Sequence, residues 1–185
     1  MAKITEVRFH GRGGQGVVTA SRLLANAALF EGKWIQAFPE FGPERAGAPI
    51  KGYTRISDEK FTIKSAVYTP DIVAVIDPTL IKLVPVTEGL KAGGIVVINS
   101  ESDPATVKNE INVQGTVGAV NATDIALETI GRPIANTAIL GALVKVTGLV
   151  KLDSIIDALL EIFKGGIGQK NVEAIKRSYE EVKVA

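Results

Sequence analysis

Hydrophobic and polar residues follow two alternating patterns along this chain of 185 residues. Short runs that are continuously apolar, or apolar at every second position, predict strands, whereas apolar residues three or four positions apart predict helices. Strand patterns occupy residues 4–10, 34–38, 50–56, 61–65, 72–77, 95–99 and 117–120. Helix patterns occupy residues 17–31, 79–90, 122–130, 134–147, 153–163 and 170–182.

Two continuously apolar segments indicate the architecture. Residues 72–77 and 95–99 have the pattern of strands that are buried on both faces of a parallel sheet. The helix at 79–90 would join them as a right-handed crossover. Residues 50–56 and 61–65 predict a hairpin that is inserted before this unit. We therefore expect an α/β fold: a single three-layer α/β/α domain with a mostly parallel sheet and an inserted β-hairpin.

Composition narrows the chemistry. With 46% apolar residues, residues 1–185 can bury one full core as one domain. A net charge of +1 without a basic stripe argues against a nucleic-acid partner. The chain has no cysteine, which excludes a disulfide framework, a catalytic thiol and a thiolate-held iron–sulfur cluster, and its single histidine, His10, leaves no pair for a metal site. No signal-peptide core and no uncharged run of spanning length is present, so we expect a cytoplasmic protein without a membrane partner.

The first strand leads into the first helix through a glycine-rich corner, residues 10–16. Glycine is needed where φ is positive or where a Cβ would collide with an approaching group. A helix N-terminus presents unpaired N–H groups and a positive dipole end, and the forked guanidinium of Arg12 suits phosphate or carboxylate. Positive charge is also in excess in this part of the chain, because residues 1–68 carry ten Lys or Arg against six Asp or Glu. We expect an anion site formed by Gly11, Arg12, Gly13, Gly14, Gln15 and Gly16.

Two other interpretations of the corner remain open. The spacing Gly11-x-Gly13-x-x-Gly16 matches the dinucleotide-binding pattern. However, no acidic residue ends the second strand roughly twenty residues on, and the chain continues into a loop and a hairpin, where a nucleotide-binding half would form a crossover helix. Alternatively, the glycines only permit a tight turn. His10, at the end of a strand, is better read as an orienting or packed residue than as a catalyst.

Two further segments are candidates for contact with a partner. Residues 38–49 form a loop stiffened by prolines and glycines, of the kind that positions binding groups, and its alternative is a solvated connection with a surface ion pair. The candidate residues of this loop are Pro39, Glu40, Phe41, Glu44 and Arg45. In the second segment, 132–142, Asn136 or Thr137 could cap a very apolar helix whose small residues allow close approach. This helix belongs to the core unless a partner chain covers it.

The blocks at residues 10–16, 36–49 and 71–78, in this order and spacing, resemble the gamma subunits of the 2-oxoacid:ferredoxin oxidoreductases. The blocks at 121–126 and 136–142 extend the resemblance to nearly the whole chain. Within this family the pyruvate enzyme, pyruvate synthase, is the nearest match. The 2-oxoisovalerate enzyme can share the same kind of gamma chain, and service to a 2-oxoglutarate enzyme is a further alternative.

The resemblance implies a subunit that is inactive alone and active in a cytoplasmic heterotetramer with alpha, beta and delta chains. In that family, thiamine diphosphate and magnesium are held by the alpha and beta chains, and [4Fe–4S] clusters by the delta chain. The complex decarboxylates a 2-oxoacid, reduces ferredoxin and transfers the acyl group to coenzyme A. The resemblance associates the gamma chain with coenzyme A binding, which would place the coenzyme at the glycine corner. It implies no catalytic residue and no metal ligand in this chain.

The residues are consistent with this division of labour. We find no Gly-Asp-Gly followed by Asn-Asn, the signature expected of a thiamine-binding chain. Two competing hypotheses are a free-standing dinucleotide-dependent oxidoreductase and an interaction module that binds no small molecule. The first depends on the glycine spacing alone, and the second on close packing of the corner against a partner backbone.

Overall fold

A seven-stranded sheet forms the centre of the computed structural model, which describes residues 3–40 and 46–185. The strand order is β2-β3-β1-β4-β5-β6-β7. The strands are β1 (Ile4–Arg12), β2 (Trp34–Pro39), β3 (Pro49–Ser57), β4 (Ile72–Val75), β5 (Ile95–Asn99), β6 (Thr116–Val120) and β7 (Lys183–Val184). Strands β1, β4, β5 and β6 pair in parallel, whereas β3 pairs antiparallel with both β1 and β2, and β7 pairs antiparallel with β6. Only β3 and β7 therefore run against the common direction, which confirms the mostly parallel sheet.

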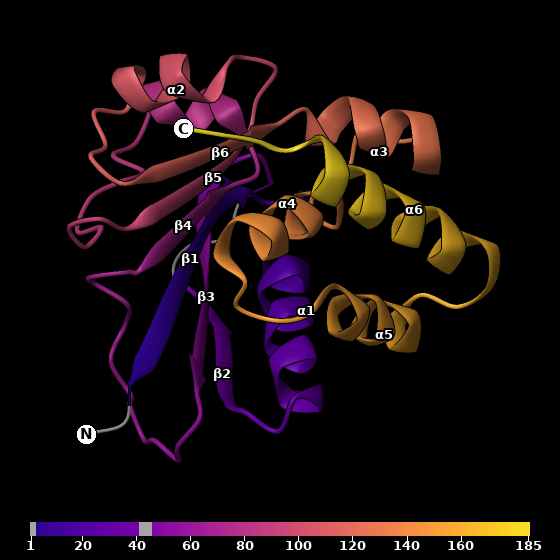
Figure 1. The fold of residues 1–185 in the computed structure, drawn as a ribbon, viewed down its shortest axis with the longest axis horizontal. Coiled ribbons are helices and arrows are strands. Elements are labelled where there is room, and N and C mark those ends of the chain that lie inside the picture. Colours follow the sequence, from indigo (N-terminus) through magenta and orange to yellow (C-terminus); the bar gives the residue numbers. More distant parts are fainter. Residues whose placement is uncertain (1–2, 41–45) are drawn as a thin grey trace.

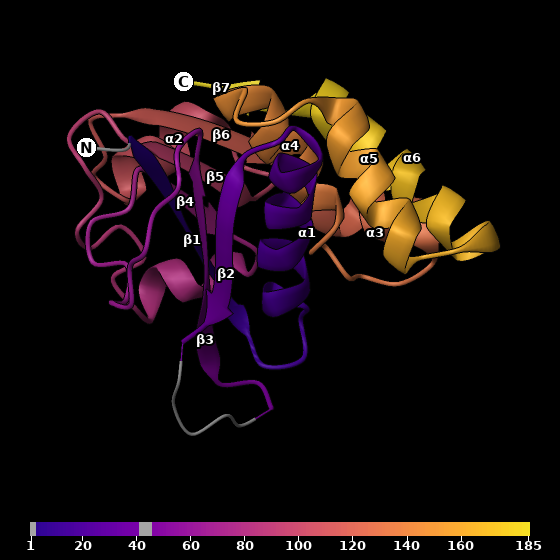
Figure 2. The ribbon, with the colours of Figure 1, turned by 90° about the horizontal axis from the view of Figure 1, so that it is seen from below.

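Helices cover the two faces of the sheet unequally (Figure 1; Figure 2). One face carries α1 (Val17–Phe30), α3 (Ala122–Ile130), α4 (Ala138–Thr147), α5 (Leu152–Ile162) and α6 (Gly165–Glu181). The other carries the 3-10 helix η1 (Pro78–Lys82) and α2 (Pro104–Glu110). Each face has its own apolar cluster, because alternate strand residues point to opposite faces: Phe9 contributes to the larger cluster, and Val73 and Val96 to the smaller. The three-layer α/β/α architecture is confirmed.

The inserted hairpin is present, but its expected second strand is wrong. The hairpin consists of β2 and β3, whose connection contains residues 40–48, and residues 61–65 form no strand. Side chains of the neighbouring strands donate hydrogen bonds to backbone carbonyls in and directly after this segment. Arg55 donates to the carbonyls of Ser65 and Ala66 at 2.9 and 3.1 Å, and Gln36 donates to that of Ile63 at 3.1 Å. The segment therefore covers a polar face of β3 and adds nothing to the ladder.

The expected helix at 79–90 is also wrong, since only η1 forms and turns follow it. Pro85 has no N–H to donate and disfavours helical geometry at the residue before it. Conversely, α2 was not expected from periodicity, although its local signals are clear. Asp103 accepts a hydrogen bond from the Ala105 N–H at 2.9 Å, and Pro104 occupies the first helical position.

Candidate functional site

The glycine-rich corner joins the end of β1 to the start of α1. Glycine is needed at different positions of this corner for different structural reasons. Gly14 and Gly16 have φ values of +94° and +75°, which disfavour a residue with a side chain. A Cβ on Gly16 would overlap the amide group of Asn136. A Cβ on Gly14 would meet no described atom within 4 Å. Gly16 therefore serves packing within the chain, whereas Gly14 leaves open space at the surface of the corner.

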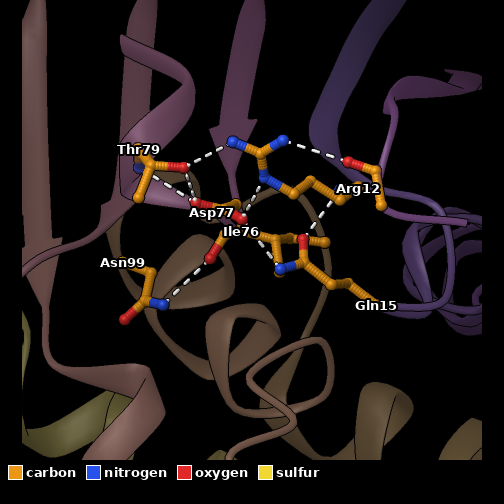
Figure 3. Close-up of polar contacts among 7 residues, drawn as sticks. Arg12, Gln15, Ile76, Asp77, Thr79 and Asn99 are labelled. Carbon is orange, nitrogen blue, oxygen red and sulfur yellow. Dashed lines mark hydrogen bonds and ion pairs between the residues drawn. The ribbon is translucent and has the colours of Figure 1, made fainter. Parts of the chain in front are cut away.

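Arg12 lies in a polar network within the chain (Figure 3). Its Nε donates to Asp77 Oδ2 at 3.0 Å, its Nη1 to the Gly47 carbonyl at 3.0 Å and its Nη2 to Thr79 Oγ1 at 2.9 Å. The amide of Gln15 accepts from the Arg12 N–H at 2.7 Å and donates to Asp77 Oδ2 at 2.8 Å. Two of the five guanidinium N–H groups make no hydrogen bond to the described residues, but the positive charge already has a carboxylate partner.

Asp77 is the centre of this network. Its second oxygen, Oδ1, accepts from the backbone N–H of Thr79 at 2.9 Å and from the Thr79 hydroxyl at 2.6 Å. Burial by itself would raise the pKa of Asp77, but the hydrogen bonds from Thr79, Gln15 and Arg12 outweigh it and lower the pKa below 3.8. The carboxylate thus fixes the end of β1 relative to the start of η1.

The corner is also tied to the segment that follows the predicted interaction loop. Gly13 donates to the Ala48 carbonyl at 2.9 Å, and Gly47 donates to the Gly13 carbonyl at 3.1 Å. Phe41, Glu44 and Arg45 lie outside the described residues, so their predicted contacts stay predictions. Pro39 ends β2, and the Glu40 carboxylate accepts from Lys51 at 3.2 Å and Tyr53 at 3.3 Å.

Asn136 and Thr137 connect the corner to the helical layer. Asn136 donates to the Gly16 carbonyl at 3.4 Å. Thr137 occupies the N-cap position of α4, but its hydroxyl makes no cap hydrogen bond and donates to Asn171 Oδ1 at 2.7 Å instead. Both side chains are buried within this chain. Their predicted role at a partner interface remains a prediction.

Two cavities flank the corner. The first, of about 270 Å³, lies at the carboxyl ends of β4 and β5, the edge of an open α/β sheet where ligands bind. Gln15, Asp77 and Asn99 are among its lining residues. The second, of about 500 Å³, is bordered by Gly13, Gly14, Gly16, the first turn of α1 and Ala46. No described side chain caps the N-terminus of α1, which leaves the N–H groups of its first turn beside this cavity.

Several residues of this region were not singled out by sequence reasoning. Asp77 follows strand β4 and Asn99 ends strand β5, so both mark the carboxyl edge of the sheet. Polar residues at the ends of continuously apolar strands could have indicated them. Arg8 is a third case: it shares one face of β1 with Arg12, and it donates to His10 Nε2 at 2.9 Å. His10 is buried, as expected of a packed or orienting residue.

The sequence profile of the pyruvate ferredoxin/flavodoxin oxidoreductase family matches residues 6–181. The chain belongs to this family. It is similar to the common subunit gamma of the pyruvate/ketoisovalerate oxidoreductases of Thermococcus kodakarensis, with 52% identity over 97% of each chain. It is also similar to the pyruvate synthase subunit PorC of Methanocaldococcus jannaschii, with 49% identity over 96% of each chain.

The structure of a relative agrees with this membership. The crystal structure of the pyruvate oxidoreductase subunit PORC of Thermotoga maritima matches with a TM-score of 0.89, 46% identity and 99% coverage of both chains. A 2-oxoglutarate:ferredoxin oxidoreductase of Magnetococcus marinus, solved with 2-oxoglutarate, coenzyme A and succinyl-CoA, matches with a TM-score of 0.76. At 20% identity, and with 31% of that longer chain covered, this second likeness concerns the fold alone.

Family membership confirms the resemblance seen in the sequence and argues against a dinucleotide-binding half. In such a half, the strand after the first helix pairs in parallel beside the first strand. Here β3 lies between β1 and β2 and runs antiparallel to both. Within residues 3–40 and 46–185, no helix has the length and apolar character needed to cross a membrane, and no three His, Asp or Glu side chains are grouped as for a metal ion.

Proposed function

We propose that this chain is the gamma subunit of a 2-oxoacid:ferredoxin oxidoreductase, with pyruvate as the substrate of the complex. The observation that carries the proposal is the match, at about half identity, to gamma and PorC subunits over nearly the full length of both chains. The same subunit could serve a 2-oxoisovalerate enzyme, because the Thermococcus relative is named as common to the pyruvate and ketoisovalerate enzymes. Service to a 2-oxoglutarate enzyme is the remaining alternative.

The chemistry of the chain supports a dependent role. Iron–sulfur clusters need thiolate ligands, and the chain has no cysteine. Its one histidine is buried and bonded to Arg8, so it offers no exposed general base. We therefore assign thiamine diphosphate, magnesium and the [4Fe–4S] clusters to alpha, beta and delta partners in the cytoplasm, with ferredoxin as the electron acceptor.

For coenzyme A, we propose the cavity beside the first turn of α1. N–H groups at a helix N-terminus favour phosphate, and the open space over Gly14 admits a ligand. Arg12 directly precedes Gly13, which borders this cavity, and its side chain is about one-quarter exposed, with Asp77 holding the guanidinium in place. The corner would thus bind the coenzyme through backbone N–H groups and a positioned arginine.

Co-purification tests the subunit assignment. The tagged native chain should carry its three partner chains, and the assembly should reduce methyl viologen with coenzyme A and pyruvate faster than with 2-oxoisovalerate or 2-oxoglutarate. The chain purified alone should be folded and inactive. Turnover by the isolated chain, or an assembly without an iron–sulfur chain, would contradict the proposal.

Arg12→Ala tests the coenzyme site. Loss of one charge-assisted contact typically costs about 1.5–3 kcal/mol, so the KM for coenzyme A should rise roughly tenfold or more. Asp77→Asn is the matched control, because it weakens the same network and keeps the guanidinium. If both variants change the KM equally, Arg12 is a structural element. Arg22→Ala, on an exposed position of α1, should leave the KM for coenzyme A unchanged.

A further inference from the structure

Arg8 is a buried cation on the sheet face opposite α1. Its side chain belongs to a residue that is only 5% exposed. Nη2 donates to the backbone carbonyls of Val86 at 3.0 Å and Glu88 at 2.6 Å, and Nε donates to the imidazole of His10. These three acceptors are uncharged. Burial lowers the pKa of Arg8, which reflects the cost of holding a cation there.

Arg55, a second buried arginine on the same face, has a carboxylate partner that compensates its charge. Its Nε pairs with Glu6 Oε1 at 2.7 Å, and Gln36 accepts from its Nη1 at 2.9 Å. Arg8 has no such partner, since no carboxylate of the described residues forms an ion pair with it. A buried charge without an opposite charge is unfavourable, so an anion that reaches Arg8 would be stabilised strongly.

Two acidic residues, Glu40 and Glu88, lie near Arg8, but neither carboxylate forms an ion pair with it. Glu40 accepts from Lys51 and Tyr53 at the edge of the region. Glu88 contributes its backbone carbonyl to Arg8, and the residue is exposed. Both carboxylates act on Arg8 only through space. The missing partner of the guanidinium therefore has to come from outside the described residues of this chain.

A cavity of about 260 Å³ opens beside Arg8. Its polar wall includes Arg8, His10, Lys51, Glu40 and Glu88, and its apolar wall includes Pro49, Val84 and Pro85. The volume is smaller than that of a typical site for a drug-sized ligand. An occupant must therefore be small, and it must combine an anionic head with a short apolar portion.

The imidazole of His10 forms an uncharged part of the cavity wall. Because its Nε2 accepts from Arg8, the ring proton lies on Nδ1. Burial, and then the charges of Arg8 and Lys51, lower the pKa of His10 to about 3. The imidazole therefore stays uncharged near neutral pH and does not compete with Arg8 for an anion.

We propose that this cavity binds a small carboxylic acid, with its carboxylate on Arg8 and a short aliphatic chain against Pro49, Val84 and Pro85. The site lies on the opposite sheet face from α1 and does not depend on the proposed coenzyme site. Arg8 provides a cation that forms no ion pair with the described residues, and the apolar wall selects for a hydrocarbon portion over a fully hydrated anion such as phosphate.

The test uses the untagged full chain, in which His10 is the single histidine and gives one assignable imidazole NMR signal. Acetate, propionate and butyrate should shift this signal saturably, with affinity rising up to about fourfold for each added methylene group. Inorganic phosphate is the comparison anion and should bind more weakly than butyrate. Binding of phosphate as tight as that of butyrate, or no saturable shift with any carboxylate, would overturn the proposal.

Two variants separate the charge from the space. Arg8→Met should weaken butyrate binding roughly tenfold or more, because the charge-assisted contact is lost. Val84→Phe should also abolish binding by filling the cavity, while Arg8 is retained. Arg22→Met, on the exposed surface of α1, is the matched control and should bind as the wild type does. Where a substitution itself shifts the His10 signal, calorimetry gives a second measurement of the affinity for butyrate. An unchanged affinity for butyrate in both Arg8→Met and Val84→Phe would refute the site.

Discussion

Strand β1 carries two arginines on one face, Arg8 and Arg12, and their surroundings differ in charge. At the end of β1, Arg12 belongs to a closed network in which Asp77 supplies the opposite charge. Four residues earlier on the same face, the acceptors that the described part of the chain offers Arg8 are all uncharged, and a cavity lies beside them. A cation whose carboxylate lies within the chain stabilises the fold. A cation without one has a stronger physical reason to bind an external anion.

Strand register explains the difference. Arg8 lies opposite Val73 of β4 and Tyr53 of β3, and neither side chain carries a charge at neutral pH. His10 lies opposite Val75, so two residues further along each strand Arg12 reaches Asp77. The parallel register thus places a carboxylate beside Arg12, the last residue of β1, and an uncharged residue beside Arg8.

The largest expected effect comes from opening the closed network. Asp77→Ala removes four accepted hydrogen bonds and leaves Arg12 without its carboxylate. We expect the free energy of unfolding to fall by about 3 kcal/mol, measured by urea denaturation. Because the folded-state pKa of Asp77 is lowered, its contribution is present above its ordinary pKa of 3.8 and disappears as pH falls through the folded value. An equally stable variant would mean that the network is incidental.

The next effect concerns the open region and its pH dependence. His10 has a folded-state pKa of about 3 against an ordinary value of 6.5, so below pH 6.5 only the unfolded chain takes up its proton. Stability should therefore fall with decreasing pH by up to 1.36 kcal/mol per unit from this group. Between pH 6.5 and about 5, the wild type should lose roughly 1.5 kcal/mol more than His10→Gln. Parallel pH profiles for the two proteins would contradict the buried neutral state.

A smaller effect separates the two glycines of the corner. Gly14→Ala and Gly16→Ala both place a side chain at positive φ, at a cost of about 1–2 kcal/mol each. Only Gly16→Ala also displaces Asn136, so it should cost about 1–2 kcal/mol more in the free energy of unfolding. The double variant Gly16→Ala/Asn136→Ala should remove most of that difference. If Gly14→Ala is the more damaging change, then the space over Gly14 is not open.

Sequence patterns predicted the parts of the fold that have strong periodicity or strong apolar character. The buried strands β4 and β5, the helix α1 and the position of the glycine corner agree with the sequence. Residues 61–65 were misjudged because their carbonyls are taken by Arg55 and Gln36, side chains from strands about ten and more than twenty residues away. Short α2 was missed because its capping residues, not its periodicity, define it.

The site was harder to predict because its chemistry depends on register. Arg12 has the residue type and helix-terminal position of an anion ligand, and nothing local to it reveals that Asp77 provides a partner from 65 positions away. Arg8 and His10 are two residues apart in an ordinary strand pattern. That Arg8 forms no ion pair with the described residues becomes evident only when the neighbouring strands and the segment around Val86 and Glu88 are in place.

The smallest expected effect on stability, and the most discriminating one, is that of Arg8→Met. The substitution loses three donated hydrogen bonds, but it also removes a buried charge that has no ion-pair partner among the described residues. Because these two effects offset each other, the free energy of unfolding should change by less than about 1 kcal/mol. Added butyrate should make the wild type the more stable protein, because a ligand that binds only the folded wild type stabilises it as its concentration rises above the dissociation constant. Urea denaturation of both proteins, with and without butyrate, measures this effect. A large loss of stability in Arg8→Met without butyrate would show that the chain itself compensates Arg8, and the contrast with Arg12 would then fail.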